Sequence, residues 1–371
     1  MPHNGPAHSS RRLPSLDGLR AISIGLVFLG HLAYSRGFPI SEAVHRAGDL
    51  GNLGVRTFFV ISGFLITGLI VAERQKKGGV DLTAFYMRRA LRIFPAFFAF
   101  VIVAVLLSRI GFANIDRLDF LHAITYTSNY RGSAPNFTFR HLWSLSVEEQ
   151  FYLIWPLTFA SLSLAMGKRT LAAVLVIVPI IRVALFSFVP GYEDYVATAF
   201  ESVCDALATG CLLALLLPRL RQEAWFQRIV FSRLFPVAFA VIYIASRGTD
   251  HPKFYLLFCI PLMNVLIALA MVRYVERPSL PFGRLLNTRA LATVGVLSYS
   301  LYLWQELFLL QWRTPVSVLQ TFPANVLAAC ACAVVSYNLV EKPFLKLKSR
   351  VEASRIPRRD PAPGVALPDA L

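Results

Sequence analysis

The stretch LDGLRAISIGLVFLGHL, residues 16–32, decides the fold. It is apolar and just long enough to cross a bilayer as a helix, yet Arg20 lies near its start and His31 near its end. Eleven helical steps of about 100° bring the two side chains to within roughly 20° of one face, about 16 Å apart along it. Ionisable groups at such depth are costly and face the protein interior or a wet cavity. We therefore predict that both are functional, with a role at the membrane interface as the alternative for each.

The composition of the whole chain agrees with a membrane protein. Of the 371 residues, 56% are hydrophobic and only 16% are charged, which is typical of a polytopic membrane protein and excludes an ordinary soluble domain. A net charge of +16 would favour nucleic acid as a partner of a soluble protein. Here the basic residues lie between apolar runs, so positive cytoplasmic loops explain them and no nucleic-acid partner is expected. The five cysteines lie inside apolar runs without metal-ligand spacing, so no metal site is expected.

The apolar runs predict an all-α fold with about ten transmembrane helices. Most of the 37 Lys and Arg fall on segments that are cytoplasmic if both ends of the chain are cytoplasmic, so we predict that orientation. The sequence shows no internal repeat, which disfavours a transporter built from inverted repeats. The predicted spans cover residues 16–35, 51–72, 93–111, 141–166, 170–189, 198–217, 229–246, 254–274, 290–312 and 322–341.

Three parts of the chain are distinguished by composition. Residues 1–15 are polar and lack a signal-peptide pattern, so we expect a cytoplasmic segment followed by a retained first span. Residues 16–345 form the membrane domain. Residues 346–371 form a basic, Pro-rich cytoplasmic tail that we expect to be disordered.

The second span, GNLGVRTFFVISGFLITGLIVA, is rich in small residues. One interpretation is that Ser62 and Gly63 leave room for an extended ligand alongside the backbone. The alternative is close helix packing, which small residues usually indicate in membrane helices.

The segment DLTAFYMRRALRIFP, residues 81–95, predicts a short helix along the inner membrane surface. Asp81 or Thr83 could cap this helix, and Pro95 is expected to mark the start of the third span.

Three arginines of this segment could converge on one ligand. Arg88 and Arg92 are four residues apart, and Arg89 and Arg92 are three apart, so their side chains can share one helix face. The guanidinium fork suits phosphate. The alternatives are ordinary positive-inside charge and the binding of anionic lipid.

The start of the fourth span carries His141, Glu148, Glu149 and Tyr152. Helical spacing places His141, Glu148 and Tyr152 roughly on one face. A carboxylate beside a histidine can orient the ring and stabilise its protonated form. The alternative is a solvated glutamate pair within an aromatic belt. Weaker intramembrane polar candidates are Arg182, Asp205, Gln305 and Glu306.

In their order and spacing, these stretches resemble the acyltransferase 3 family, integral-membrane enzymes that O-acylate glycans and other cell-envelope or secreted substrates. The resemblance covers nearly the whole chain and rests on residues 16–32 together with GVRTFFVISGFLI, FYMRRALRIFPAFF, WSLSVEEQFYLIWP, LSYSLYLW and VEKPF. It implies a multi-pass protein of the bacterial inner membrane. It also implies an acyl-CoA, with acetyl-CoA as the expected one, as a cytoplasmic donor substrate. No permanently bound cofactor is expected, and the implied acceptor is a surface or exported polysaccharide or glycolipid.

The same resemblance assigns residues. Arg20 and His31 match the family's essential Arg and His of the first span, Arg89 and Arg92 its inner-loop arginine pair, and Glu148 the glutamate of its WSL-x-VE stretch. We therefore take His31, Glu148 and Arg20 as the candidate catalytic residues. His31, backed by Glu148, would deprotonate the acceptor hydroxyl, and Arg20 would orient the donor or stabilise negative charge. Direct transfer and an acyl-histidine relay both stay open.

The donor would be bound on the inner side. We expect Arg89 and Arg92, with Arg88, to hold the coenzyme A phosphates. The pantetheine arm would then pass Ser62 and Gly63 toward the histidine.

Two points limit the resemblance. Many relatives carry a histidine where this chain has Gln305, so that position is left out of the site. The sequence ends soon after the tenth predicted span, so we expect no esterase-like domain of the kind that some relatives carry, and a second transfer step would then need another protein. The competing function is a transporter or flippase of a polar or lipid-linked substrate.

Overall fold

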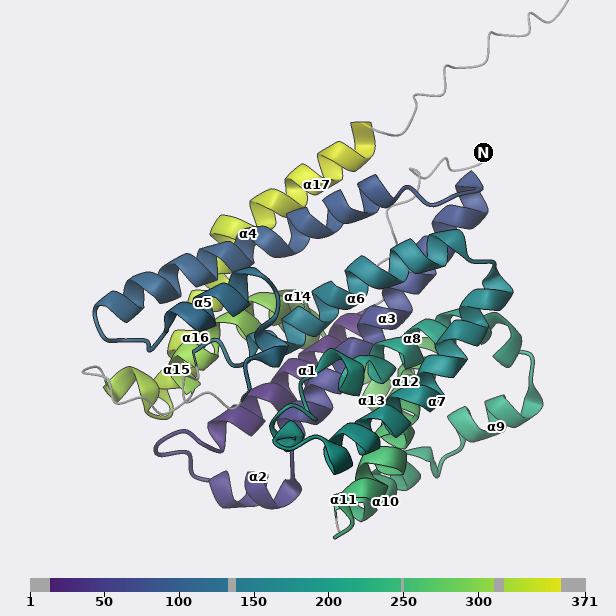
Figure 1. The fold of residues 1–371 in the computed structure, drawn as a ribbon, viewed down its shortest axis with the longest axis horizontal. Coiled ribbons are helices and arrows are strands. Elements are labelled where there is room, and N and C mark those ends of the chain that lie inside the picture. Colours follow the sequence, from purple (N-terminus) through teal and green to yellow (C-terminus); the bar gives the residue numbers. More distant parts are fainter. Residues whose placement is uncertain (1–13, 133–137, 248–249, 310–316, 355–371) are drawn as a thin grey trace, which may run out of the picture.

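The computed structural model describes residues 14–132, 138–247, 250–309 and 317–354. Over these residues the protein is 82% helical and contains no strand, so the predicted all-α class of a polytopic membrane protein is confirmed. The helices run side by side in a bundle with their connections at its two ends (Figure 1).

Seven helices are long and apolar enough to cross a membrane, or eight if one bent pair is counted as a span, among the described residues. The predicted count of ten is not confirmed. The bent pair, α9 (Ala224–Phe231) and α10 (Phe235–Arg247), turns by 72° between its two parts. The seven are α1 (Pro14–Leu32), α3 (Leu50–Lys77), α4 (Leu82–Arg109), α7 (Leu164–Phe188), α8 (Phe200–Leu220), the α11–α12 run (Pro252–Glu276) and the α16–α17 run (Ala324–Arg350).

The two remaining predicted spans are helical, but neither is both long and apolar enough to count among the membrane-spanning helices. The fourth corresponds to α6 (Leu142–Ser161), whose polar side chains lower its hydropathy. The ninth corresponds to α14 (Arg289–Trp304), followed at once by the short α15 (Glu306–Leu309). The 16 residues of α14 extend only about 24 Å, less than the roughly 30 Å of a hydrocarbon core.

Two of the spans consist of several consecutive helices. The first run comprises α11 (Pro252–Phe254), η3 (Tyr255–Cys259) and α12 (Ile260–Glu276), and the second comprises α16 (Ala324–Ser336), η5 (Tyr337–Glu341) and α17 (Lys342–Ser354). The short helices of the described residues are α2 (Ser41–Ala47), α5 (Arg117–Ile124), η1 (Ser128–Tyr130), η2 (Tyr192–Asp194), α13 (Pro281–Leu286) and η4 (Ser317–Gln320).

The predicted surface helix over residues 81–95 is not a separate element. It forms the first half of α4, which continues through Pro95 to Arg109. The predicted cap is confirmed, because the Asp81 carboxylate accepts a hydrogen bond of 2.8 Å from the Ala84 amide. A proline removes one backbone hydrogen bond from a helix but does not by itself end one that neighbouring helices support.

The start predicted for the disordered tail, residue 346, lies too early in the sequence. Residues 346–354 belong to α17, which lies along α4 (Figure 1). The rest of the tail, residues 355–371, and nearly all of segment 1–15 lie outside the described residues.

Close helix packing, and not a ligand, explains Gly63. A Cβ atom placed on Gly63 would lie 2.0 Å from the Leu207 carbonyl oxygen of α8, and one on Gly210 of α8 would lie 2.0 Å from the Val60 carbonyl oxygen of α3. The two helices therefore approach each other backbone to backbone, as small residues allow in membrane bundles. Gly63 lines neither of the two cavities described below, so the structure favours the packing alternative for this residue over a contact with the donor.

Replacing Gly63 by Ala is expected to lower stability by about 1–3 kcal/mol, because the added methyl must push two helix backbones apart. The matched control is Gly68→Ala on the same helix, where an added Cβ meets nothing within 4 Å. Thermal unfolding of both variants in detergent would measure the difference. Equal melting temperatures would contradict the packing assignment.

Candidate active site

Two cavities penetrate the helix bundle. The first, which we call the arginine cavity, has a volume of about 1100 Å³ and is lined by residues of α1, α3, α4, α6 and α14. The second, which we call the histidine cavity, has a volume of about 970 Å³ and contains His31. The candidate residues of the sequence are divided between them.

The arginine cavity collects the predicted basic residues. Arg88, Arg89 and Arg92 of α4 line it together, so the convergence expected from their spacing is observed, and Arg20 of α1 joins them. In total, seven Lys and Arg and three Asp and Glu line the cavity. Its excess of positive charge suits an anionic ligand.

Two of these arginines are held by neighbouring carboxylates. The Arg89 guanidinium lies 3.9 Å from a Glu148 oxygen and 3.6 Å from a Glu149 oxygen, and its central carbon is 3.6 Å from the centre of the Tyr152 ring. Arg88 forms an ion pair of 3.3 Å with Glu73. All three contacts of Arg89 are on α6, so α6 fixes its position.

Arg20 and Arg92 differ from this pair. Both line the cavity, and neither forms a hydrogen bond or ion pair with another residue in the described ranges. Their guanidinium groups therefore present hydrogen-bond donors toward the cavity that a bound anion can use.

Glu148 belongs to the arginine cavity. One of its oxygens accepts a hydrogen bond of 2.5 Å from the Ser62 hydroxyl, and the other faces Arg89. Ser62 itself lines the cavity. The sequence hypothesis that Glu148 backs His31 does not match this arrangement, because the carboxylate beside His31 comes from another helix.

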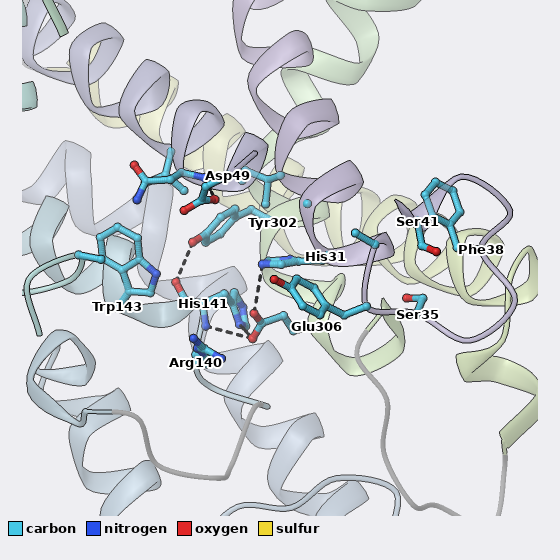
Figure 2. Close-up of a pocket in the computed structure, with 18 of the residues that line it drawn as sticks. His31, Ser35, Phe38, Ser41, Asp49, Arg140, His141, Trp143, Tyr302 and Glu306 are labelled. Carbon is cyan, nitrogen blue, oxygen red and sulfur yellow. Dashed lines mark hydrogen bonds and ion pairs between the residues drawn. The ribbon is translucent and has the colours of Figure 1, made fainter. Parts of the chain in front are cut away.

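That carboxylate is Glu306 of α15. One oxygen of Glu306 accepts hydrogen bonds from the His141 Nδ1 at 2.8 Å and from the His141 backbone amide at 3.0 Å. The other oxygen lies 3.6 Å from the His31 Nε2 (Figure 2). One carboxylate thus lies between two imidazoles, and it is only 2% exposed whereas His31 is 24% exposed.

His141 also departs from the helical-face prediction. It precedes α6 and lies on the histidine cavity, whereas Glu148 and Tyr152 line the arginine cavity. Because the carboxylate is the acceptor, the Nδ1 of His141 carries a proton. From the sequence alone, Glu306 is only one of the weaker candidates. The available signal was a lone carboxylate in an apolar run, which by default marks an intramembrane site.

Two of the other weak candidates, Arg182 and Asp205, have a structural explanation. Arg182 and Asp205 are fully buried and form an ion pair of 2.7 Å between α7 and α8. Arg182 also donates hydrogen bonds to the backbone carbonyls of Ser202 and Leu256. Neither residue lines either cavity. A buried pair of this kind ties helices together within a membrane bundle.

The chain is similar to a known protein family and to relatives named for their activity. A family profile described as an acyltransferase domain, that of acyltransferase 3, matches residues 13–339. The chain is 29% identical to O-acetyltransferase OatA of Staphylococcus aureus strain NCTC 8325 over 371 residues, and it is equally similar to OatA of strain COL. Each alignment covers 91% of this chain and 58% of the relative, so the chain spans somewhat more than half the length of these proteins. No solved structure matches the chain.

Proposed function

The chain belongs to the acyltransferase 3 family, and from that premise we propose that it is a membrane O-acetyltransferase. The donor is acetyl-CoA or another acyl-CoA, and the acceptor is a hydroxyl group of a surface or exported polysaccharide or glycolipid. The observation that carries the proposal is the division of the site into a cationic cavity and a second cavity holding a histidine–carboxylate pair.

The arginine cavity is the proposed donor site. Coenzyme A carries several phosphate charges, and Arg20 and Arg92 have guanidinium donors directed to the cavity. Arg89 and Arg88 add charge at positions fixed by Glu148 and Glu73. In this account the arginine cavity opens to the cytoplasm of a bacterial cell and the protein lies in the inner membrane.

The histidine cavity is the proposed place of the reaction. When the proton of the neutral His31 ring is on Nδ1, the Nε2 lone pair is available to a hydroxyl group, because Nε2 lies 3.6 Å from Glu306, which is longer than a hydrogen bond. As the hydroxyl oxygen attacks the thioester carbonyl carbon, His31 takes the hydroxyl proton. The carbon–sulfur bond then breaks, and the imidazolium returns the proton to the thiolate. The products are an ester and free coenzyme A.

Glu306 acts on this reaction through charge. The imidazolium that forms on His31 lies beside the Glu306 carboxylate, which stabilises the positive charge. The two hydrogen bonds from His141 hold that carboxylate in place. Glu148 has a different role on this proposal: it positions Arg89 and Ser62 in the donor site.

The purified protein provides the test. In liposomes, the wild type should release coenzyme A from acetyl-CoA in the presence of surface glycan isolated from a deletion strain, and the glycan should gain an ester. A transporter or flippase would move its substrate without consuming acetyl-CoA. Absence of ester formation with every acyl-CoA offered would count against the proposal and in favour of transport.

A further inference from the structure

The two cavities share part of their lining. Val55 of α3 and Tyr302 of α14 line both the arginine cavity and the histidine cavity. Beside them, Trp143 lines only the histidine cavity and the next residue, Ser144, lines only the arginine cavity. The boundary between the cavities therefore lies at the level of Val55 and Tyr302.

Tyr302 is held at this boundary by hydrogen bonds to Ser144 of α6 and to His141, which directly precedes α6. Its hydroxyl donates to the backbone carbonyl of His141 at 2.7 Å and lies 2.5 Å from the Ser144 hydroxyl oxygen. Because the single tyrosine proton is used by the carbonyl, the Ser144 hydroxyl donates to Tyr302. The bonded pair joins α14 to α6, so the tyrosine ring is fixed between the cavities.

The boundary is tightly packed. Tyr302 is 8% exposed and Val55 is 6% exposed, although both border cavities of about 1000 Å³. Tyr302 also contacts the ring of His141, with 5.4 Å between the ring centres. A group that moves between the cavities at this boundary therefore meets a tyrosine ring and a branched aliphatic side chain.

We propose that Tyr302, together with Val55, limits the size of the acyl group that passes from the arginine cavity to His31. This inference rests on the proposed function, in which the donor binds in one cavity and reacts in the other. Tyr302 is then a specificity-determining residue: its ring admits a two-carbon acyl group and excludes longer chains.

The test is a competition between acetyl-CoA and butyryl-CoA at equal concentration. Purified protein in liposomes is given the surface glycan of the deletion strain, and acetyl and butyryl esters on the glycan are counted by mass spectrometry. The wild type should form mainly acetyl ester. Tyr302→Ala should shift the product ratio toward butyryl by about tenfold or more, since a single methylene is worth roughly that discrimination in a pocket.

Further variants separate the ring from its hydroxyl and from general damage. Tyr302→Phe keeps the ring and should keep the acetyl preference, even if loss of the bond to His141 lowers the rate. Val55→Ala leaves every hydrogen bond of Tyr302 intact and should shift the ratio in the same direction as Tyr302→Ala, by less. The matched control is Tyr34→Ala, which enlarges only the histidine cavity and should leave the ratio unchanged.

The ratio is measured on whatever fraction of each variant is folded, so a loss of yield does not obscure it. An unchanged ratio in both Tyr302→Ala and Val55→Ala, with an active wild type, would overturn the size limit. Equal use of both donors by the wild type would overturn it as well. A wild type that forms no ester from any donor would instead contradict the proposed function.

Discussion

Glu306→Gln is expected to lower the rate of acyl transfer by about 10²- to 10⁴-fold, which is the usual contribution of general-base catalysis. The substitution keeps the size of the side chain and removes the charge that stabilises protonated His31, from which it is 3.6 Å away. Acyl-CoA affinity should stay close to that of the wild type, because Glu306 does not line the arginine cavity. Transfer rates and donor binding are measured on the same purified protein.

Glu148→Gln is the matched control, since it makes the same chemical change in the other cavity. It should weaken acyl-CoA binding, because Arg89 and Ser62 lose the carboxylate that positions them. The two variants thus separate a defect in chemistry from a defect in donor binding. The reverse result, with donor affinity kept in Glu148→Gln and transfer kept in Glu306→Gln, would restore the pairing of His31 with Glu148 that the sequence suggested.

Arg92→Ala is expected to reduce acyl-CoA affinity by about 10- to 150-fold, the range for a lost hydrogen bond to a charged group of about 1.5–3 kcal/mol. Arg92 is a cleaner choice than Arg89. Removing Arg89 would leave Glu148 and Glu149 without their arginine, whereas Arg92 has no ion pair with the residues described in the structure. Binding of a non-hydrolysable acyl-CoA analogue to protein in detergent gives the affinity directly.

Two controls show whether a loss of affinity in Arg92→Ala reflects recognition of phosphate. Arg109→Ala removes an exposed arginine from the far end of the same helix and should leave the affinity unchanged. Acetyl-pantetheine, which lacks the nucleotide phosphates, should bind equally weakly to the wild type and to Arg92→Ala. If acetyl-CoA bound to Arg92→Ala as tightly as to the wild type, the arginine cavity would not be the phosphate site.

Sequence reasoning reached the fold class and the arginine cluster because both depend on local spacing. Hydropathy over about twenty residues identifies a membrane helix, and side chains three or four residues apart share a helix face whatever surrounds them. Arg88, Arg89 and Arg92 were therefore placed together correctly. Asp81 was recognised as a cap for the same reason, since a cap bonds to a residue only three positions away.

The contacts between helices could not be obtained in this way. Glu148 follows His141 by seven residues and Glu306 follows it by 165, yet Glu306 is the one that binds His141. Hydropathy and periodicity do not say which helices are neighbours. Gly63 illustrates the same limit, because its neighbour at Leu207 is set by how α3 and α8 pack. The predicted boundary at Pro95 was wrong for another reason. A proline disfavours the interior of a helix, but the packing of the bundle overrides that preference, and α4 continues through Pro95.

The most direct measurement of the central claim is the O-acyl content of surface and secreted glycans, by mass spectrometry and NMR. Wild-type cells, a deletion strain, and the deletion complemented with wild type, His31→Ala or Glu306→Gln are compared at matched amounts of membrane-inserted protein. The account predicts that a defined ester disappears on deletion and returns only with the wild-type gene. Full restoration of that ester by His31→Ala or by Glu306→Gln would contradict it.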